Sequence, residues 1–236
     1  MDLANNNINF DEILKKVEEI KQIDPLRAIY IIDEELKNVI SENDIADLNA
    51  LRDNVIFQIK KNNLIVKTSL DTLTLINLLK NKKMDYAFMV MYNELKTREN
   101  LAKYAKDFQY FFDEINFDSA GFQTLIYDLL VLKDIDFNYK VNGEIINPKK
   151  MGSFLKNEGV NKMQEKILNL FEKDISKIKI ARQVFSAYLF QNWIDILLNR
   201  TSNDYEQIFN VVQVLYGEKS SKDLTEKEHK LYNVFK

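Results

Sequence analysis

Apolar residues recur along most of this chain at intervals of three and four positions, the period of an amphipathic helix. The first such stripe consists of Phe10, Ile13, Leu14, Val17 and Ile20. The same period predicts further helices over residues 25–39, 44–59, 69–79, a stretch ending at 95, 100–115, 119–132, 161–173, 178–198, 205–215 and 225 to the end. Only two prolines and five glycines interrupt the pattern. The chain is therefore predicted to be all-α.

Several helix starts carry their own signals. Asp24 precedes Pro25, and an acidic cap followed by proline in the first turn is typical of a helix N-terminus. Ser69 is expected to cap the fourth helix in the same way. In residues 178–198 the apolar positions cover more than half of the helix circumference, which predicts a helix buried between its neighbours.

Residues 135–146 change from the helical period to a period of two. Ile135, Phe137, Tyr139 and Val141 alternate with polar residues. Asn142-Gly143 follows and is the strongest short signal for a hairpin turn. Ile145 and Ile146 supply a return strand, which Pro148 ends. One small β-hairpin is therefore expected among the helices.

About eleven helices with short loops favour an α-α superhelix of stacked antiparallel helix pairs over a single four-helix bundle. We expect an N-terminal helical-repeat region at 1–134, and a β-hairpin plus C-terminal helical region at 135–236 that continues it as one elongated domain. The repeat period is loose, and a complete tetratricopeptide consensus is absent from the sequence.

Composition narrows the class of protein. The 236 residues include 33 Lys and Arg against 36 Asp and Glu, a net charge of −3, which fits neither a strongly basic nucleic-acid binder nor an acidic tail protein. The absence of cysteine excludes disulfides, thiolate metal sites and thiol nucleophiles. Residues 1–9 lack the order of a signal peptide, and no apolar run approaches a membrane span. We expect a cytoplasmic protein without membrane association.

Candidate catalytic groups are few. His229 is the only histidine and lies in a charged run that we interpret as solvated. Carboxylates are adjacent in Asp33-Glu34-Glu35 and in Asp113-Glu114, but neighbouring helical residues point about 100° apart and do not converge on one substrate atom. These groups are interpreted as solvated helix faces, so no catalytic residue and no enzymatic activity are predicted.

Asp134, Asp136 and Asn138 begin like a calcium-binding EF-hand loop. The pattern then fails, because Tyr139 replaces the glycine of the sharp turn and Ile145 replaces the final glutamate. Glycine-rich phosphate loops and zinc-binding helix pairs are also absent from the sequence. Neither a metal nor a cofactor is expected.

Charge is unevenly distributed along the chain. Residues 1–59 contain 6 basic and 13 acidic side chains, a net charge of −7, whereas residues 147–182 contain 9 basic and 4 acidic side chains, a net charge of +5. The basic segment could follow a phosphate backbone or could be an ordinary solvated lysine face, which we favour because arginine is scarce there. The candidate partner-binding surface comprises Lys149, Lys150, Lys156, Lys162 and Lys166.

Three segments carry a resemblance to a known family. They are residues 24–36 (DPLRAIYIIDEEL), similar to the second helix of a tetratricopeptide-like unit, residues 73–104 with Leu95, Arg98, Leu101 and Tyr104 in a helix-turn-helix register, and the hairpin at 135–148. On these segments, about half of the chain, the sequence resembles an uncharacterised family of Gram-positive and mollicute proteins, a domain of unknown function described as tetratricopeptide-like. The resemblance implies an α-α superhelix and supplies no catalytic residue.

Two functions from different classes follow. The first is a non-enzymatic helical-repeat scaffold that binds a protein or peptide partner in a groove between helices, an expectation that rests on analogy at the level of the fold. The alternative is RNA or ribosome association through residues 147–182. An enzyme with an unfamiliar carboxylate site is the least favoured of the hypotheses.

Overall fold

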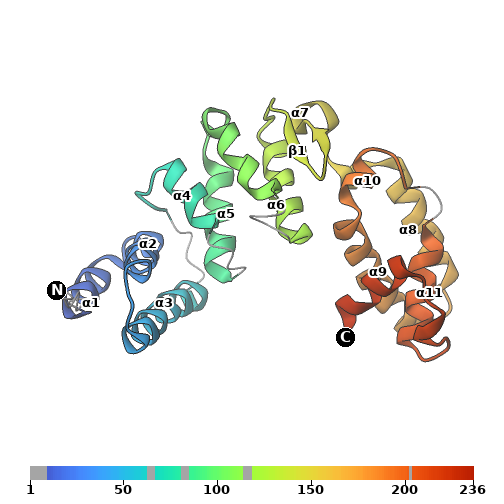
Figure 1. The fold of residues 1–236 in the computed structure, drawn as a ribbon, viewed down its shortest axis with the longest axis horizontal. Coiled ribbons are helices and arrows are strands. Elements are labelled where there is room, and N and C mark those ends of the chain that lie inside the picture. Colours follow the sequence, from blue (N-terminus) through green and yellow to red (C-terminus); the bar gives the residue numbers. More distant parts are fainter. Residues whose placement is uncertain (1–9, 63–66, 81–84, 114–118, 202–203) are drawn as a thin grey trace, which may run out of the picture. The chain divides into compact units, whose positions relative to one another are not determined.

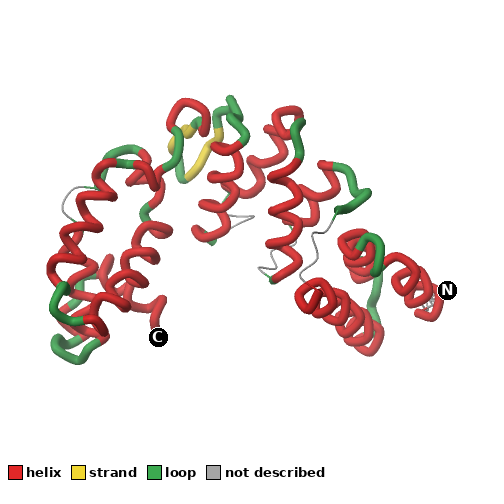
Figure 2. Tube along the Cα trace, turned by 180° about the vertical axis from the view of Figure 1, so that it is seen from behind, coloured by secondary structure: helices red, strands yellow, loops and turns green. Residues whose placement is uncertain are grey.

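The protein is mainly helical with one small antiparallel sheet, as the sequence predicts (Figures 1 and 2). The computed structural model describes residues 10–62, 67–80, 85–113, 119–201 and 204–236. Packing divides the chain into two compact units, Met1–Asp107 and Phe108–Lys236. The expected boundary after residue 134 stays a prediction.

The helices of the first unit are α1 (Phe10–Ile20), α2 (Pro25–Leu36), α3 (Glu42–Asn62), α4 (Thr72–Leu79), α5 (Tyr86–Thr97) and the start of η1 (Leu101–Phe112). The predicted cap of α2 is confirmed, because Asp24 Oδ1 accepts a hydrogen bond from the Arg27 amide at 3.0 Å. The prediction that Ser69 caps α4 is wrong. Asp71 performs this function and accepts from the Thr74 amide at 2.9 Å, because α4 begins at Thr72.

The core of the first unit forms where α2 packs on α1 and α3, and where α5 packs on α3 and α4. The predicted apolar stripes are buried there, including Leu26, Ile29, Ile32, Leu48, Val55, Ile59, Leu75, Ile76 and Leu95. Burial of these aliphatic side chains is the main favourable contribution to the stability of the unit.

Asp33 corrects the expectation of a solvated carboxylate face. It lies four residues after Ile29 and therefore on the buried side of α2. Asp33 is 7% exposed, and its Oδ1 accepts a hydrogen bond from Nε of Arg52 at 2.7 Å. Arg52, on α3, is 4% exposed and also donates to Oδ2 of Asp85 at 2.6 Å. Glu34 and Glu35 are partly exposed, so only Asp33 of these three carboxylates is a core group.

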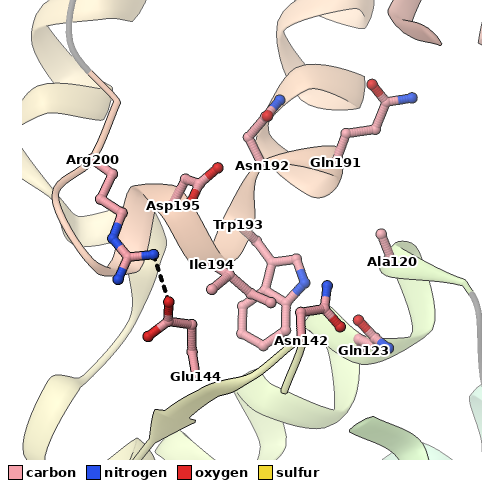
Figure 3. A pocket seen from close by; sticks show the side chains of 10 residues that line it. All are labelled: Ala120, Gln123, Asn142, Glu144, Gln191, Asn192, Trp193, Ile194, Asp195 and Arg200. Carbon is pink, nitrogen blue, oxygen red and sulfur yellow. Dashed lines mark hydrogen bonds and ion pairs between the residues drawn. The ribbon is translucent and has the colours of Figure 1, made fainter. Parts of the chain in front are cut away.

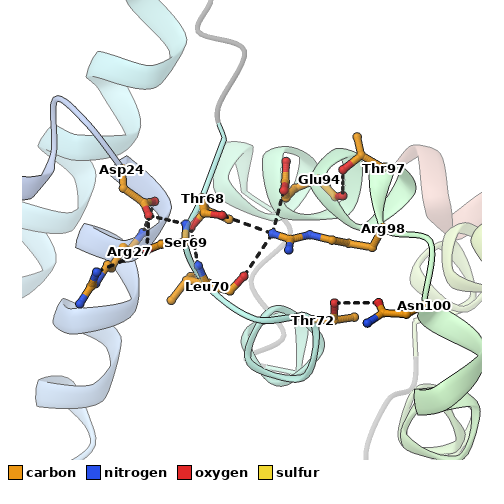
Figure 4. A network of polar contacts seen from close by, with 10 residues as sticks. All are labelled: Asp24, Arg27, Thr68, Ser69, Leu70, Thr72, Glu94, Thr97, Arg98 and Asn100. Carbon is orange, nitrogen blue, oxygen red and sulfur yellow. Dashed lines mark hydrogen bonds and ion pairs between the residues drawn. The ribbon is translucent and has the colours of Figure 1, made fainter.

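Polar contacts around Asp24 join α2 to the segment that precedes α4 (Figure 4). Its Oδ2 accepts from the Ser69 amide at 2.7 Å and from the Ser69 hydroxyl at 2.8 Å. On the other side of this segment, Arg98 donates to the carbonyl oxygens of Thr68 and Leu70. Residues 68–70 are thereby held between α2 and the end of α5 without secondary structure of their own.

The Asp24 contacts predict a specific sensitivity to acid. Burial by itself raises the pKa of Asp24, but the hydrogen bonds from Ser69, Thr68 and Arg27 outweigh it and hold the pKa below its ordinary value. The folded protein therefore binds this proton less readily than the unfolded chain. The resulting stability is present above about pH 4 and is lost as the pH falls through the folded-state pKa.

We expect Asp24→Asn to lower the free energy of unfolding by about 1–3 kcal/mol at pH 7, since hydrogen bonds to a charged acceptor are lost. At pH 3 the difference from the wild type should shrink, as measured by urea unfolding at both values. Asp53→Asn, at an exposed position of α3, is the matched control and should have little effect at either pH. A loss at Asp24 that is equal at pH 7 and pH 3 would contradict the prediction.

The end of the first unit and the start of the second contain η1. The predicted α-helix over 100–115 is wrong in type, because η1 is a 3₁₀ helix with a non-helical residue at Tyr104. Most of the predicted apolar stripe is nevertheless buried, namely Leu101, Ala105, Phe108, Phe111 and Phe112, whereas Tyr104 is partly exposed. Ile115, the expected last residue of the stripe, lies outside the described residues.

The second unit continues with α6 (Ala120–Leu132), β1 (Tyr139–Val141), β2 (Glu144–Ile146), α7 (Pro148–Met151), η2 (Phe154–Lys156), α8 (Glu158–Leu170), α9 (Ile175–Gln191), α10 (Trp193–Leu197), α11 (Tyr205–Leu215), η3 (Ser221–Asp223), α12 (Glu226–Tyr232) and η4 (Asn233–Phe235). The predicted helix 178–198 is interrupted at Asn192, whose side chain donates to the Tyr188 carbonyl at 2.9 Å. Such a contact competes with the helical ladder.

The predicted hairpin is confirmed. β1 and β2 pair antiparallel, with Tyr139 opposite Ile146 and Val141 opposite Glu144. Asn142 and Gly143 both have positive φ, 49° and 83°, as a type I′ turn requires. The side-chain amide of Gln109 donates to the Lys140 carbonyl and accepts from the Lys140 N–H. It thereby satisfies both backbone groups of Lys140 at the outer edge of β1.

The strands are shorter than the alternation predicts, because the segment before β1 is held by a side chain. Asn147 Nδ2 donates to the side-chain oxygens of Asp136 and Asn138, at 2.9 Å each. These oxygens are two of those that begin the EF-hand-like pattern, and here they fix a loop. Asn147 also caps α7, so Pro148 begins a helical turn as well as ending the hairpin.

The core of the second unit contains an aromatic cluster around Trp193. Its ring centroid lies 5.1 Å from that of Tyr127, and 6.2 Å from those of Phe112 and Phe154. Phe112 in turn contacts Tyr139 of β1 at 5.1 Å. The cluster joins η1, α6, the hairpin and η2 to α10. Beside it, α11 packs on α8, α9 and α12 (Figure 1).

Candidate partner-binding surfaces

The five predicted lysines lie on three elements of the second unit, and all are exposed. Lys149 and Lys150 are on α7, Lys156 ends η2, and Lys162 and Lys166 are one turn apart on α8. The sequence therefore places them correctly at the surface. They do not form a single helix face.

Three of these lysines already interact with neighbouring side chains. Lys149 Nζ lies 3.0 Å from Asp134, and Lys162 Nζ lies 2.6 Å from Glu158. The hydrogen bond to each carboxylate raises the pKa of the lysine above its ordinary value. Lys166 Nζ lies 3.5 Å from the ring centroid of Tyr205. These contacts reduce the positive potential that the lysines offer to a phosphate backbone.

An apolar groove, which the sequence did not predict, lies along the outer face of α9. Its volume is about 660 Å³. The groove is lined by α9 (Arg182, Gln183, Ser186, Ala187, Phe190, Gln191), the start of α6 (Ser119, Ala120, Gly121) and η4 (Val234, Phe235). Phe190 is 42% exposed and Val234 is 56% exposed. Among the described residues, Arg182 is the one charged residue in this lining.

The local sequence explains how α9 presents this face. Ala181, Val184 and Tyr188 are buried, which directs the opposite side of the helix outward. On that outward side the residues change from basic and polar at Arg182 to apolar at Phe190. An exposed aromatic residue on an otherwise polar helix face is the sequence signal that could have indicated the groove.

A smaller, polar pocket of about 330 Å³ adjoins the groove (Figure 3). Its lining includes the amides Gln123, Asn142, Gln191 and Asn192, the charged residues Glu144, Asp195 and Arg200, and Trp193 at its base. Arg200 Nη1 donates to Glu144 at 2.7 Å, and this bond lowers the pKa of the Glu144 carboxyl. Ala120 and Gln191 line both hollows, so the pocket and the groove are neighbours.

The acid–base candidates that the sequence analysis rejected lie on separate elements, with Asp33 on α2 and His229 on α12. His229 is partly exposed, and its neighbour Glu228 corrects the interpretation of a wholly solvated run. Glu228 is buried and accepts hydrogen bonds from the Thr225 amide and from Asn210. Burial alone raises the pKa of Glu228, but these bonds lower it overall. Glu228 is therefore an ionised capping residue of α12.

The buried phenols of Tyr127, Tyr139 and Tyr188 stay protonated near neutral pH. Burial raises the pKa of Tyr127 and Tyr139, and burial with the hydrogen bond to Asp204 raises that of Tyr188. Asp113 is partly exposed, whereas Glu114 lies outside the described residues. Within the described part of the chain no three His, Asp or Glu side chains are grouped to hold a metal ion.

None of the family models, curated proteins and solved structures compared with this chain matches it. The resemblance to tetratricopeptide-like proteins therefore stays a prediction. None of the helices in the described ranges is long and apolar enough to cross a membrane.

Proposed function

We propose that this chain is a non-enzymatic helical binding protein that takes an amphipathic helical segment of a partner protein in the apolar groove. The observation that carries the proposal is the size and lining of the groove, with an exposed phenylalanine on one wall and Val234 on another. Exposed apolar patches of this kind mark interaction sites in soluble proteins.

The groove fits a helix because two of its walls, the start of α6 and the middle of α9, carry small residues. Ala120, Gly121, Ser186 and Ala187 have short side chains, which allow the backbone of a second helix to approach closely. Phe190 then supplies a large contact area at one end. In helix-in-groove recognition, apolar residues at positions i, i+3 or i+4 and i+7 of the ligand fill such a surface.

The wider parts of the proposal concern architecture and location. We propose that the helices stack as an α-α superhelix and that the protein acts in the cytoplasm, a location consistent with the lack of cysteine.

RNA association through residues 147–182 remains the alternative. The ion pairs of Lys149 and Lys162 support ranking it second, because paired lysines release fewer counterions on binding RNA.

A fluorescent 18-residue helical peptide with leucine and phenylalanine on one face and only neutral polar residues on the other tests the groove. We expect measurable binding by fluorescence anisotropy, and a loss of about tenfold or more in Ala187→Arg, which places a long cation inside the groove. Lys156→Gln, at an exposed lysine outside the groove, is the control and should bind as the wild type does.

Salt dependence separates the two functions. Apolar binding should change little between 50 and 200 mM salt, whereas RNA binding through about six phosphate contacts should weaken by a factor of about 10³ or more. Peptide binding that is unchanged in Ala187→Arg would overturn the proposal. So would tight binding of a single-stranded RNA that is lost when Lys149, Lys150, Lys156 and Lys162 are replaced by glutamine.

A further inference from the structure

We propose that the apolar groove and the polar pocket form one continuous peptide site with opposite charges at its two ends. The partner helix would carry an acidic residue at the Arg182 end, apolar residues in the middle, and a lysine or arginine at the Asp195 end. This inference rests on the proposed function and specifies the chemistry of the partner.

The two hollows are neighbours that share part of their lining. Ala120 and Gln191 belong to both. In the pocket these two residues lie on the opposite side from Arg200 and Glu144 (Figure 3). A ligand that spans both hollows would pass Gln191 and approach the charged side of the pocket.

The groove end of the site is positive. Arg182 is exposed, and no ion pair with it occurs among the residues that the structure describes. Its helix, Ile175–Gln191, contains no Asp or Glu, and exposed Lys179 lies one turn before Arg182. An acidic side chain on a partner would meet the exposed Arg182 here, in a surface that desolvates as the apolar residues dock.

The pocket end of the site is negative. It contains two carboxylates, Glu144 and Asp195, against the single guanidinium of Arg200. Arg200 is hydrogen-bonded to Glu144 and also attracts Asp195 electrostatically, while Asp195 itself is an exposed carboxylate on α10. A partner lysine or arginine could pair with it, and the amides of Asn142 and Gln191 line the same space.

The spacing of the charges matches a helix of moderate length. Arg182 and Gln191 are nine residues apart on α9, which corresponds to roughly 13 Å along the helix axis. Asp195 follows on the next helix. A ligand helix would therefore need its acidic and basic residues about three turns apart, with two turns of apolar residues between them.

Four peptides with the same apolar face test this inference. The residue for the Arg182 end is named first and the residue for the Asp195 end second. The four peptides carry glutamate and lysine, glutamate and glutamine, glutamine and lysine, or glutamine at both ends. Since an exposed ion pair changes affinity by about 2–5-fold, the peptide with glutamate and lysine should bind about 4–25-fold more tightly at 50 mM salt than the neutral peptide.

Two variants identify which residue meets which charge. Arg182→Gln should weaken the glutamate–lysine peptide by about 2–5-fold and leave the glutamine–lysine peptide unchanged. Asp195→Asn should weaken the glutamate–lysine peptide similarly and leave the glutamate–glutamine peptide unchanged. Lys162→Gln, on α8, is the control variant and should alter none of the four affinities.

The outcomes separate this inference from the proposed function. If the neutral peptide binds and the charged peptides bind no better, the groove is a peptide site and the charge assignment is wrong. If neither variant changes the affinity of the glutamate–lysine peptide, the assignment is likewise overturned. If no peptide binds, including the neutral one, the proposed function itself fails.

Discussion

Replacing Arg52 by alanine is expected to lower the free energy of unfolding by about 3–5 kcal/mol. Arg52 is buried in α3 and hydrogen-bonds Asp33 of α2 and Asp85, the residue that caps α5. Without the guanidinium, the buried carboxylate of Asp33 and the partly buried carboxylate of Asp85 lose the cation that compensates their desolvation. The cost therefore exceeds that of an ordinary surface pair, for which the median is near zero.

Urea unfolding followed by far-UV circular dichroism measures this loss. Lys16→Ala, which breaks the exposed pair with Glu12 on α1, is the control and should change stability little. If Arg52→Ala does not fold, Arg52→Lys replaces it as the test. Arg52→Lys keeps the charge but cannot make both hydrogen bonds, and it should still be less stable than the wild type. A wild-type unfolding curve for either variant would show that the buried pairs do not stabilise the unit.

Asp33 shows where the sequence analysis was limited. The helical period places it correctly on α2, but the period alone does not say that Arg52, nineteen residues later, will face it. Burial of a carboxylate depends on a partner from another helix, and pairing between helices is set by tertiary packing. A charged residue at i+4 from a core isoleucine was the available signal.

Ser69 and Asn192 show a second limit. Ser69 is a good cap by residue type, yet Asp71 two residues later is equally good, and the structure uses Ser69 to bond Asp24 instead. At Asn192 the apolar pattern continues without a break, but the side chain bonds the backbone of the preceding turn. Local competition of this kind shifts helix ends while leaving the helices themselves predictable.

Of the candidate surfaces, the lysines were predictable and the groove was not. Exposed lysines follow from composition and helical period, since a charged side chain is rarely buried. The groove combines α9 with the start of α6 and with η4, segments far apart in the sequence. No pattern within one segment states which others will border it. The hairpin, by contrast, was predictable because Asn142 and Gly143 specify their turn locally.

Trp193→Ala is expected to lower the free energy of unfolding of the second unit by about 3–5 kcal/mol. Trp193 is 1% exposed and contacts the rings of Tyr127, Phe112 and Phe154. Removing the indole leaves a cavity among rings that come from three different elements, and a close-packed core closes such a cavity only in part. Trp193→Phe keeps part of this volume and should cost clearly less.

Since Trp193 is the only tryptophan, its fluorescence reports on the second unit, whereas circular dichroism reports on both. Wild-type emission should shift to longer wavelength on unfolding in urea, as the indole becomes exposed. In Trp193→Ala, dichroism should show the transition moving to lower urea. In Arg52→Ala, the fluorescence shows whether the second unit also loses stability, because Arg52 itself lies in the first unit, Met1–Asp107. A Trp193→Ala transition that coincides with the wild type would show that the aromatic cluster is not the core of the second unit.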